Sequence, residues 1–191
     1  MLKTFAVAAV VAGLLLAAGC SRKPPTPTIN ASMTQVMSTQ AQTIWDITSG
    51  AFNAKGDGLV ASKIAPGDWI ALGEAGRKLR DRSLLLAAAP HVVVVGPGET
   101  IMGEDASGAS GKLGHDWDAA SAKLVQARID ANPALFARRM RILAKTGDTV
   151  LKASQTHDVG PLYEASAGLD EVCDGCHKPF WGTDDPPPFP H

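Results

Sequence analysis

The sequence contains few of the residues that build β-rich folds and zinc sites. Its 191 residues include three cysteines and one tyrosine, whereas glycine occurs 19 times and alanine and leucine are abundant. A chain rich in alanine and leucine and poor in tyrosine favours helices over a β-sandwich. Because there is no fourth cysteine, a zinc site made of four cysteines is excluded. We therefore expect an all-α protein.

The chain also lacks an excess of charge of either sign. Its 18 lysine and arginine residues balance 19 aspartate and glutamate residues, which gives a formal net charge of −1. Basic residues form no run longer than an arginine pair, so the sequence indicates no nucleic-acid partner. The length allows one ordinary domain together with a targeting segment.

The first 19 residues have the order of regions that is typical of an export signal. Lys3 supplies the positive charge, residues 5–18 form an apolar run, and small residues precede Cys20. The segment resembles a bacterial lipoprotein signal, in which the cysteine receives the lipid and becomes the mature N-terminus. The commonest lipoprotein signal has leucine three residues before that cysteine, where this chain has Ala17.

Two other interpretations of this segment stay open. The first is an ordinary secretory signal that is cut nearby. The second is an uncleaved membrane anchor, although the apolar run is short for a membrane-spanning helix. Lipid attachment at Cys20 would hold the protein on the periplasmic side of a bacterial membrane, whereas simple secretion would leave it soluble in the periplasm. Residues 20–29 are rich in proline and are expected to form a tether.

Close to the C-terminus, the residues Cys173-Asp174-Gly175-Cys176-His177 match C-x-x-C-H, the attachment motif of a c-type haem. On a helix, Cys173, Cys176 and His177 would stand at positions i, i+3 and i+4 and share one face. Two sulfur atoms can then form thioethers to the porphyrin edge while the imidazole reaches the iron as proximal ligand. The motif predicts one covalent haem c per chain.

Two alternatives compete for the same five residues. A zinc site would need further ligands at paired spacing, and a thioredoxin-like redox pair should lie beside a β-α-β pattern. The sequence shows neither feature. The cysteine count favours haem, because lipid at Cys20 and thioethers at Cys173 and Cys176 leave no cysteine unexplained.

Hydrophobic periodicity predicts four main helices within residues 30–181. The first has Asn30 or Ser32 as its cap and runs to about Phe52, and the second begins at Pro66 and ends before Pro90. Residues 91–115 form a long irregular loop between the second and third main helices. Its valine run at 92–95 has strand character, but without a partner we expect extended chain laid over the helices.

After this loop the pattern is helical again. We expect a short helix from a cap at Asp116 or Asp118 to Asp130, and a third main helix that begins at Asn132-Pro133. Gly147 is expected to be a weak point of that third helix. The last helix should begin at Gly160-Pro161 and stop near His177 or Lys178, because Pro179 disfavours continuation. Residues 182–191 are expected to form an extended tail.

Four amphipathic helices with the haem motif on the last one predict a four-helix bundle with a cofactor site in its core. In this respect the chain resembles the class II c-type cytochromes, which comprise the cytochrome c-prime family and its low-spin, methionine-ligated relatives. It also resembles bacterial cytochromes c that pair a first-helix Met and Trp with a C-terminal C-x-x-C-H and an aromatic pair, here Met37, Trp45 and Phe180-Trp181. The first helix lacks the Arg-Gln pair that cytochrome c-prime places near the haem propionates.

The resemblance implies an electron carrier rather than an enzyme, with haem c as its cofactor and an unidentified redox protein as its partner. The alternative is a five-coordinate haem module that binds or senses a small gas such as nitric oxide. Cytochrome c-prime relatives often form homodimers through their first two helices, although no apolar stripe in the sequence of these helices predicts a dimer independently. No distal His and Arg pair supports a peroxidase.

The sixth ligand of the iron is expected from the first helix, because low-spin relatives take it from there. Met37 is favoured and Met33 is the alternative, and both also suit the role of core fillers. Met102 lies in the glycine-rich loop and is a weaker candidate, while His91, His115 and His157 are expected at the surface. Three tryptophans are expected either to wall the haem or to be plain core: Trp45, Trp69 and Trp181.

Overall fold

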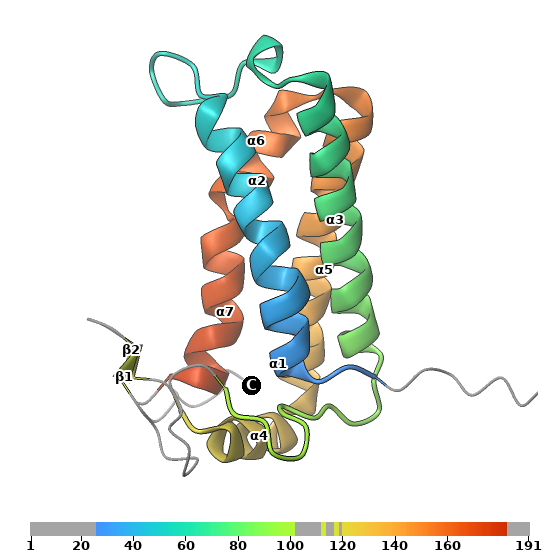
Figure 1. The fold of residues 1–191 in the computed structure, drawn as a ribbon, viewed down its shortest axis with the longest axis vertical. Helices are drawn as coiled ribbons and strands as arrows, with labels where there is room; N and C mark the ends of the chain where they lie inside the picture. Colours follow the sequence, from blue (N-terminus) through green and yellow to red (C-terminus); the bar gives the residue numbers. More distant parts are fainter. Residues whose placement is uncertain (1–25, 102–111, 114–116, 119, 183–191) are drawn as a thin grey trace, which may run out of the picture.

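The computed structural model describes residues 26–101, 112–113, 117–118 and 120–182, and these residues are mostly helical (Figure 1). The elements in chain order are α1 (Ile29–Ser32), the π-helical segment η1 (Met33–Met37), α2 (Ser38–Gly50), the 3₁₀ turn η2 (Ala61–Lys63), α3 (Pro66–Ala87), β1 (Lys112–Leu113), β2 (Trp117–Asp118), α4 (Ala122–Ala131), α5 (Pro133–Thr156), α6 (Val159–Ala167) and α7 (Leu169–Trp181). The strands β1 and β2 pair antiparallel over two residues each.

The first helix begins earlier than the sequence predicts. Thr28 is its cap, because the Thr28 hydroxyl accepts a hydrogen bond from the backbone N–H of Ala31 at 3.1 Å. The predicted caps were wrong: Asn30 and Ser32 lie inside α1, and the Ser32 hydroxyl donates back to the Thr28 carbonyl. α1, η1 and α2 follow one another without a break and end at Gly50, close to the predicted end.

The two proline starts are confirmed. α3 begins at Pro66 and α5 begins at Pro133, and each proline stands at a first-turn position where its missing N–H leaves no bond unmade. The Asn132 side chain caps α5 by accepting from the Leu135 N–H at 3.0 Å. α3 and α5 form the most extensive helix pair of the described residues.

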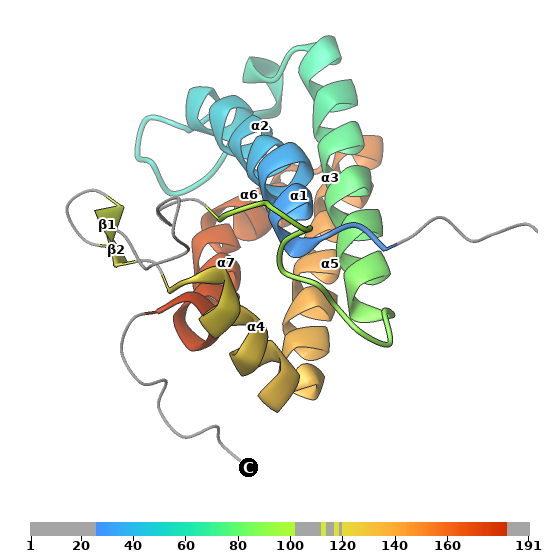
Figure 2. The same ribbon diagram turned by 60° about the horizontal axis from the view of Figure 1, so that its bottom comes forward.

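The short helix α4 does not use the predicted cap. Its cap is Ser121, whose hydroxyl accepts from the Leu124 N–H at 3.2 Å. Asp118 belongs to β2 instead, and Asp116 lies outside the described residues. The α4 helix lies across one end of the longer helices, as Figures 1 and 2 show.

The valine run at 92–95 belongs to no strand, as predicted, but the chain is not simply extended, because it bends at Val94 and Val95. The carbonyls of Val93 and Val94 accept the N–H groups of Ile29 and Asn30, both at 2.9 Å. From the other side, the Gln126 side chain of α4 bonds the Val94 N–H and the Val92 carbonyl, again at 2.9 Å each. The segment therefore joins the start of the first helix to α4.

The last predicted helix is two helices, α6 and α7, which meet at Gly168. The predicted stop at His177 or Lys178 was wrong, because α7 continues through Pro179 to Trp181. Two contacts favour this continuation. Phe180 is fully buried, with its ring 5.7 Å from that of Phe136, and Arg128 donates hydrogen bonds to the carbonyls of Phe180 and Gly182.

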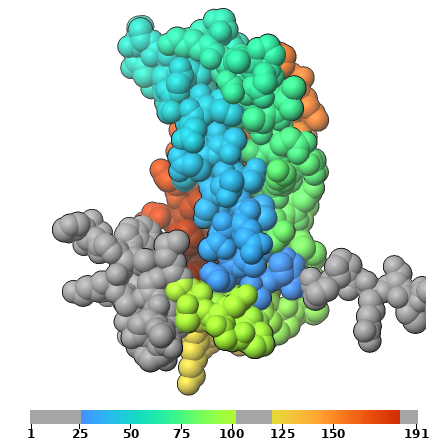
Figure 3. Space-filling model, viewed as in Figure 1, coloured from blue at the N-terminus to red at the C-terminus, as the bar shows by residue number. Residues whose placement is uncertain are grey.

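The long helices run side by side and enclose one apolar core. Buried side chains come from the first helix, α3, α5, α6 and α7, and the largest include Ile44, Leu72, Phe136, Leu162 and Phe180. Figure 3 shows that α1, α2 and α3 cover one face of the molecule, with α7 set back at the edge of that face. The first and last helices are therefore neighbours around the core.

Candidate functional site

The haem-attachment motif lies on α7, and its reactive side chains share one helical face. Cys173, Cys176 and His177 all belong to the helix Leu169–Trp181, so the spacing i, i+3 and i+4 applies. Leu169 and Phe180 are both fully buried and hold the helix near its two ends. The prediction that the motif is helical is confirmed.

The first helix contributes three of the predicted residues to the same region. Met37 is buried, with 4% of its surface exposed, and Met33 is half-buried. Trp45 is held by a hydrogen bond from its Nε1 to the Ser166 carbonyl of α6, at 3.3 Å. The hydroxyls of Thr48 and Ser166, 2.7 Å apart, tie the same two helices together.

One cavity brings these two sets of residues together. Its volume is about 360 Å³, and Met33, Met37 and Trp45 line it along with the whole attachment motif except Gly175. This volume lies within the range of roughly 300–1,000 Å³ that is usual for small-molecule sites. The first and last helices therefore face each other across a hollow that can take a ligand.

A π-helical segment runs from Met33 to Met37 beside this cavity. The Ser38 N–H donates to the Met33 carbonyl, five residues back rather than the four of an α-helix. Single π-helical turns within α-helices occur frequently at functional sites. The sequence gives no local signal for this wider turn, because the hydrophobic spacing of the two methionines suits an ordinary helix equally well.

Two residues of α5 also line the cavity and were not predicted as site residues. Met140 has 1% of its surface exposed and adds a third thioether to those of Met33 and Met37. Arg139 lines the cavity as well, and its buried Nε has no hydrogen-bond partner among the residues that the structure describes. The sequence places Met140 on the apolar stripe of its helix, but Arg139 has no feature that separates it from the other arginines.

Burial favours the neutral forms of the two cysteines and the histidine of the motif. It raises the pKa of the Cys173 thiol to about 11, with the nearby Asp170 and Asp174 carboxylates adding to the effect. It raises the pKa of the Cys176 thiol to about 12. It also lowers the pKa of His177, which Asp174 partly opposes. A neutral imidazole is the form that binds a metal.

The other two tryptophans that were predicted as haem walls or core, Trp181 and Trp69, differ in their relation to the site. The Trp181 ring lies edge-on to His177, with ring centres 6.0 Å apart, so it can support the orientation of the imidazole. The Trp69 ring instead stacks on His157 at 4.8 Å, and neither of these two residues lines the cavity. His157 has a left-handed backbone and ends α5.

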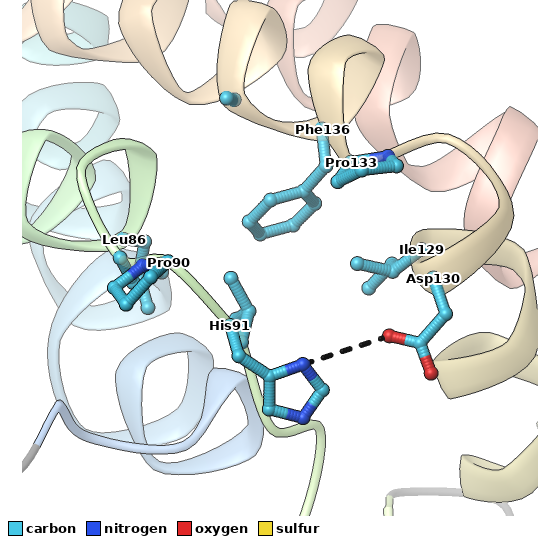
Figure 4. A pocket seen from close by; sticks show the side chains of 10 residues that line it. Leu86, Pro90, His91, Ile129, Asp130, Pro133 and Phe136 are labelled. Atoms are coloured by element: carbon cyan, nitrogen blue, oxygen red, sulfur yellow. Dashed lines mark ion pairs between the residues drawn. The ribbon is translucent and has the colours of Figure 1, made fainter.

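A second cavity of about 330 Å³ lies where α3, α4 and α5 meet, and Figure 4 shows its lining. Phe136, Leu86 and Ile129 supply apolar walls, while His91 stands at the rim. The side chain of His91 is 65% exposed and its Nδ1 lies 3.9 Å from the Asp130 carboxylate. The prediction that His91 lies at the surface is confirmed.

Three predicted residues lie outside the described part of the chain: Cys20, Met102 and His115. Of the described helices, none is long and apolar enough to cross a membrane. Within the described ranges, no group of three or more His, Cys, Asp or Glu side chains is placed to hold a metal ion. Cys173 and Cys176 are not joined by a disulfide.

Comparison with known proteins provides no relative. No protein-family model matches the chain, and no curated protein or solved structure is significantly similar to it.

Proposed function

We propose that this chain is a c-type cytochrome that carries single electrons. The observation that carries this proposal is the cavity between the first and last helices. It is lined by Cys173, Cys176 and His177 on one side and by Met33 and Met37 on the other. These are the two thiols, the imidazole and the thioether that a covalently bound, six-coordinate haem requires.

The residues around the cavity fit a haem in a further respect. Leu79, Met140 and Leu143 supply apolar walls, which suit a large flat aromatic ligand. We propose that the fold is the four-helix bundle of the class II cytochromes, to which the sequence has a motif-level resemblance.

Within this proposal each protein group has a definite task. Cys173 and Cys176 would hold the porphyrin edge through thioethers, and His177 would be the proximal ligand of the iron. Met37, or Met33 in its place, would be the sixth ligand. The bound haem supplies a one-electron redox centre, whose potential is raised by a Met/His ligand pair relative to stronger donors. The apolar walls would limit access of water to this centre.

The cellular location is part of the proposal. The first 19 residues and Cys20 support a lipoprotein anchored on the periplasmic side of a bacterial membrane, with simple secretion as the alternative. Haem attachment to c-type cytochromes takes place outside the bacterial cytoplasm, which agrees with an export signal. The electron partner would be another redox protein of that compartment.

Expression in a bacterial host that attaches haem covalently tests this function. We expect the denatured protein to keep its haem through acid–acetone extraction and its mass to include one haem per chain. The matched control is the double variant Cys173→Ala/Cys176→Ala, which should lose the haem on extraction. Apoprotein with a Cys173–Cys176 disulfide, recovered from such a host, would contradict the proposal.

The ultraviolet-visible spectrum of the reduced holoprotein then separates a carrier from a gas sensor. A six-coordinate Met/His centre should change little when carbon monoxide is added, because both axial positions are occupied. A large change on adding the gas would indicate an open sixth position and favour a module that binds a small gas such as nitric oxide.

A further inference from the structure

The last turn of α7 follows a residue that ordinarily ends a helix. Pro179 has no N–H to donate to the carbonyl of Gly175, four residues earlier, and its ring crowds that carbonyl. The helix nevertheless continues to Trp181. Since local chemistry disfavours this turn, contacts with other parts of the chain must hold it in place.

Contacts with the core and with α4 hold this turn. Phe180 is fully buried, so it anchors the turn in the apolar core. The Trp181 carbonyl accepts the N–H of Ala120 at 3.2 Å. Arg128 of α4 donates to the carbonyls of Phe180 and Gly182. The carbonyls of three successive residues are therefore bonded, which gives the Trp181 side chain a defined position.

This turn places the indole of Trp181 beside the imidazole of His177. Their ring centres are 6.0 Å apart and the ring planes make an angle of 66°, so one ring presents its edge to the other. Both residues are half-buried. His177 lines the cavity between the first and last helices, whereas Trp181 does not. The indole therefore meets the imidazole from outside the space that would hold the haem.

A contact of this kind restricts the rotation of the imidazole. The torsion about the Cβ–Cγ bond of histidine has broad energy wells, so the plane of the ring is set by its neighbours. On α7 the side chains four residues from His177 are Cys173 and Trp181, and these share its face. In the proposed holoprotein Cys173 would be bound to the porphyrin edge. Of these two neighbours, the indole is then the one that can pack against the ring.

We propose that Trp181 is a positioning residue for His177, and that its indole fixes the orientation of the imidazole that serves as proximal ligand. This inference rests on the proposed function. Groups that orient a metal-bound histidine set the direction of its ring plane and tune the metal. The hydrogen bonds from Ala120 and Arg128 act on this orientation through Trp181, although neither residue lines the cavity.

The test compares the oxidised holoproteins of wild type, Trp181→Leu and Trp181→Phe by proton NMR. The shifts of the haem methyl resonances depend on the orientation of the axial imidazole, because that orientation decides how the unpaired electron spin spreads over the porphyrin. We expect Trp181→Leu to change the order or the spread of these shifts. Trp181→Phe keeps an aromatic ring at this position and should bring the pattern closer to that of wild type.

Trp69→Leu is the matched control, because it removes an indole that stacks on His157 and does not line the cavity. It should lower the stability of the protein and leave the methyl pattern unchanged. A wild-type pattern in Trp181→Leu, an equal change in Trp69→Leu, or no rescue by phenylalanine at position 181 would overturn the proposal.

The reduced wild-type holoprotein provides a readout that needs no variant, should Trp181→Leu fold poorly. We expect nuclear Overhauser effects between the ring protons of His177 and Trp181, since the two rings are in contact. Their absence would overturn the proposal. Each of these negative results leaves the proposed function standing, whereas wild-type protein without covalent haem would remove both.

Discussion

Gly76 of α3 and Gly147 of α5 bring the backbones of the two helices into direct contact. A Cβ atom added to Gly76 would lie 2.6 Å from the Gly147 carbonyl oxygen, and one added to Gly147 would lie 2.7 Å from that of Gly76. Neither backbone can move without shifting its whole helix. Gly147 was expected to be a weak point of α5, but it is instead the position that allows α3 to approach.

This contact predicts that Gly147→Ala destabilises the protein. Alanine favours a helix by about 1 kcal/mol over glycine, but its methyl group would overlap the backbone of α3. We expect the steric effect to dominate and to lower the free energy of unfolding by about 1–3 kcal/mol, as measured by urea denaturation. Gly67→Ala in α3 is the control, because a Cβ there meets nothing within 4 Å. Equal stability of the two variants would contradict this account of the helix pair.

Asp148 links the same two helices through charge. Its carboxylate lies 2.6 Å from Lys152 Nζ and 3.5 Å from Arg80 Nη1, and these cations lower its pKa below the ordinary value of 3.8, with the hydrogen bond from Lys152 as the largest cause. Because the folded-state pKa is depressed, the stabilisation is present above the unfolded-state pKa. It is lost as the pH falls through the folded-state pKa.

We therefore expect Asp148→Asn to remove a small part of the acid-induced loss of stability below about pH 4. The Asp148 carboxyl titration, followed by NMR, tests the cause directly. Its pKa should rise more in Lys152→Gln than in Arg80→Gln. The opposite order would mean that Arg80 of α3, rather than Lys152 of α5, is the main cause of the lowered Asp148 pKa.

Arg128 of α4 closes the C-terminal end of α7 with hydrogen bonds to the Phe180 and Gly182 carbonyls. We expect Arg128→Gln to lower the free energy of unfolding by about 1.5–3 kcal/mol, the usual contribution of hydrogen bonds to charged groups. Amide exchange in the last turn of α7 should accelerate. Arg141→Gln is the control, since Arg141 is exposed on α5. Unchanged exchange in α7 would show that the buried Phe180 side chain alone holds this turn.

The three cavity methionines can be distinguished by replacing each with leucine, which keeps the volume and removes the thioether at a cost below about 1.5 kcal/mol. In holoprotein, Met37→Leu should abolish the weak sulfur–iron charge-transfer band in the near-red of the oxidised spectrum and lower the reduction potential. Met33→Leu and Met140→Leu should keep both. If Met33→Leu alone loses the band, the sixth ligand is Met33, one turn earlier on the helix. If all three variants keep the band, none of the three methionines is the ligand and they only pack in the core.

Local sequence signals were sufficient for the starts of α3 and α5 and for the helical state of the haem-attachment motif. Pro66 and Pro133 marked the starts of α3 and α5 correctly, since proline suits the first turn of a helix. The motif from Cys173 to His177 was placed on a helix, which the structure confirms. The caps at Asn30 or Ser32 and at Asp116 or Asp118 were wrong, because several neighbouring polar residues can serve and packing selects among them.

The end of α7 and the lining of the cavity depended on contacts between distant residues. Pro179 predicts a helix end by its local chemistry, yet the burial of Phe180 against Phe136 and the hydrogen bonds from Arg128 outweigh it. The position of Arg139 at the cavity and the π-helical turn at Met33–Met37 have no local signature. The apolar stripe predicts that Met140 is buried, but not that it lines the cavity. Periodicity predicts which face of a helix is buried. The neighbour that this face meets depends on how the helices pack together, which no single segment encodes.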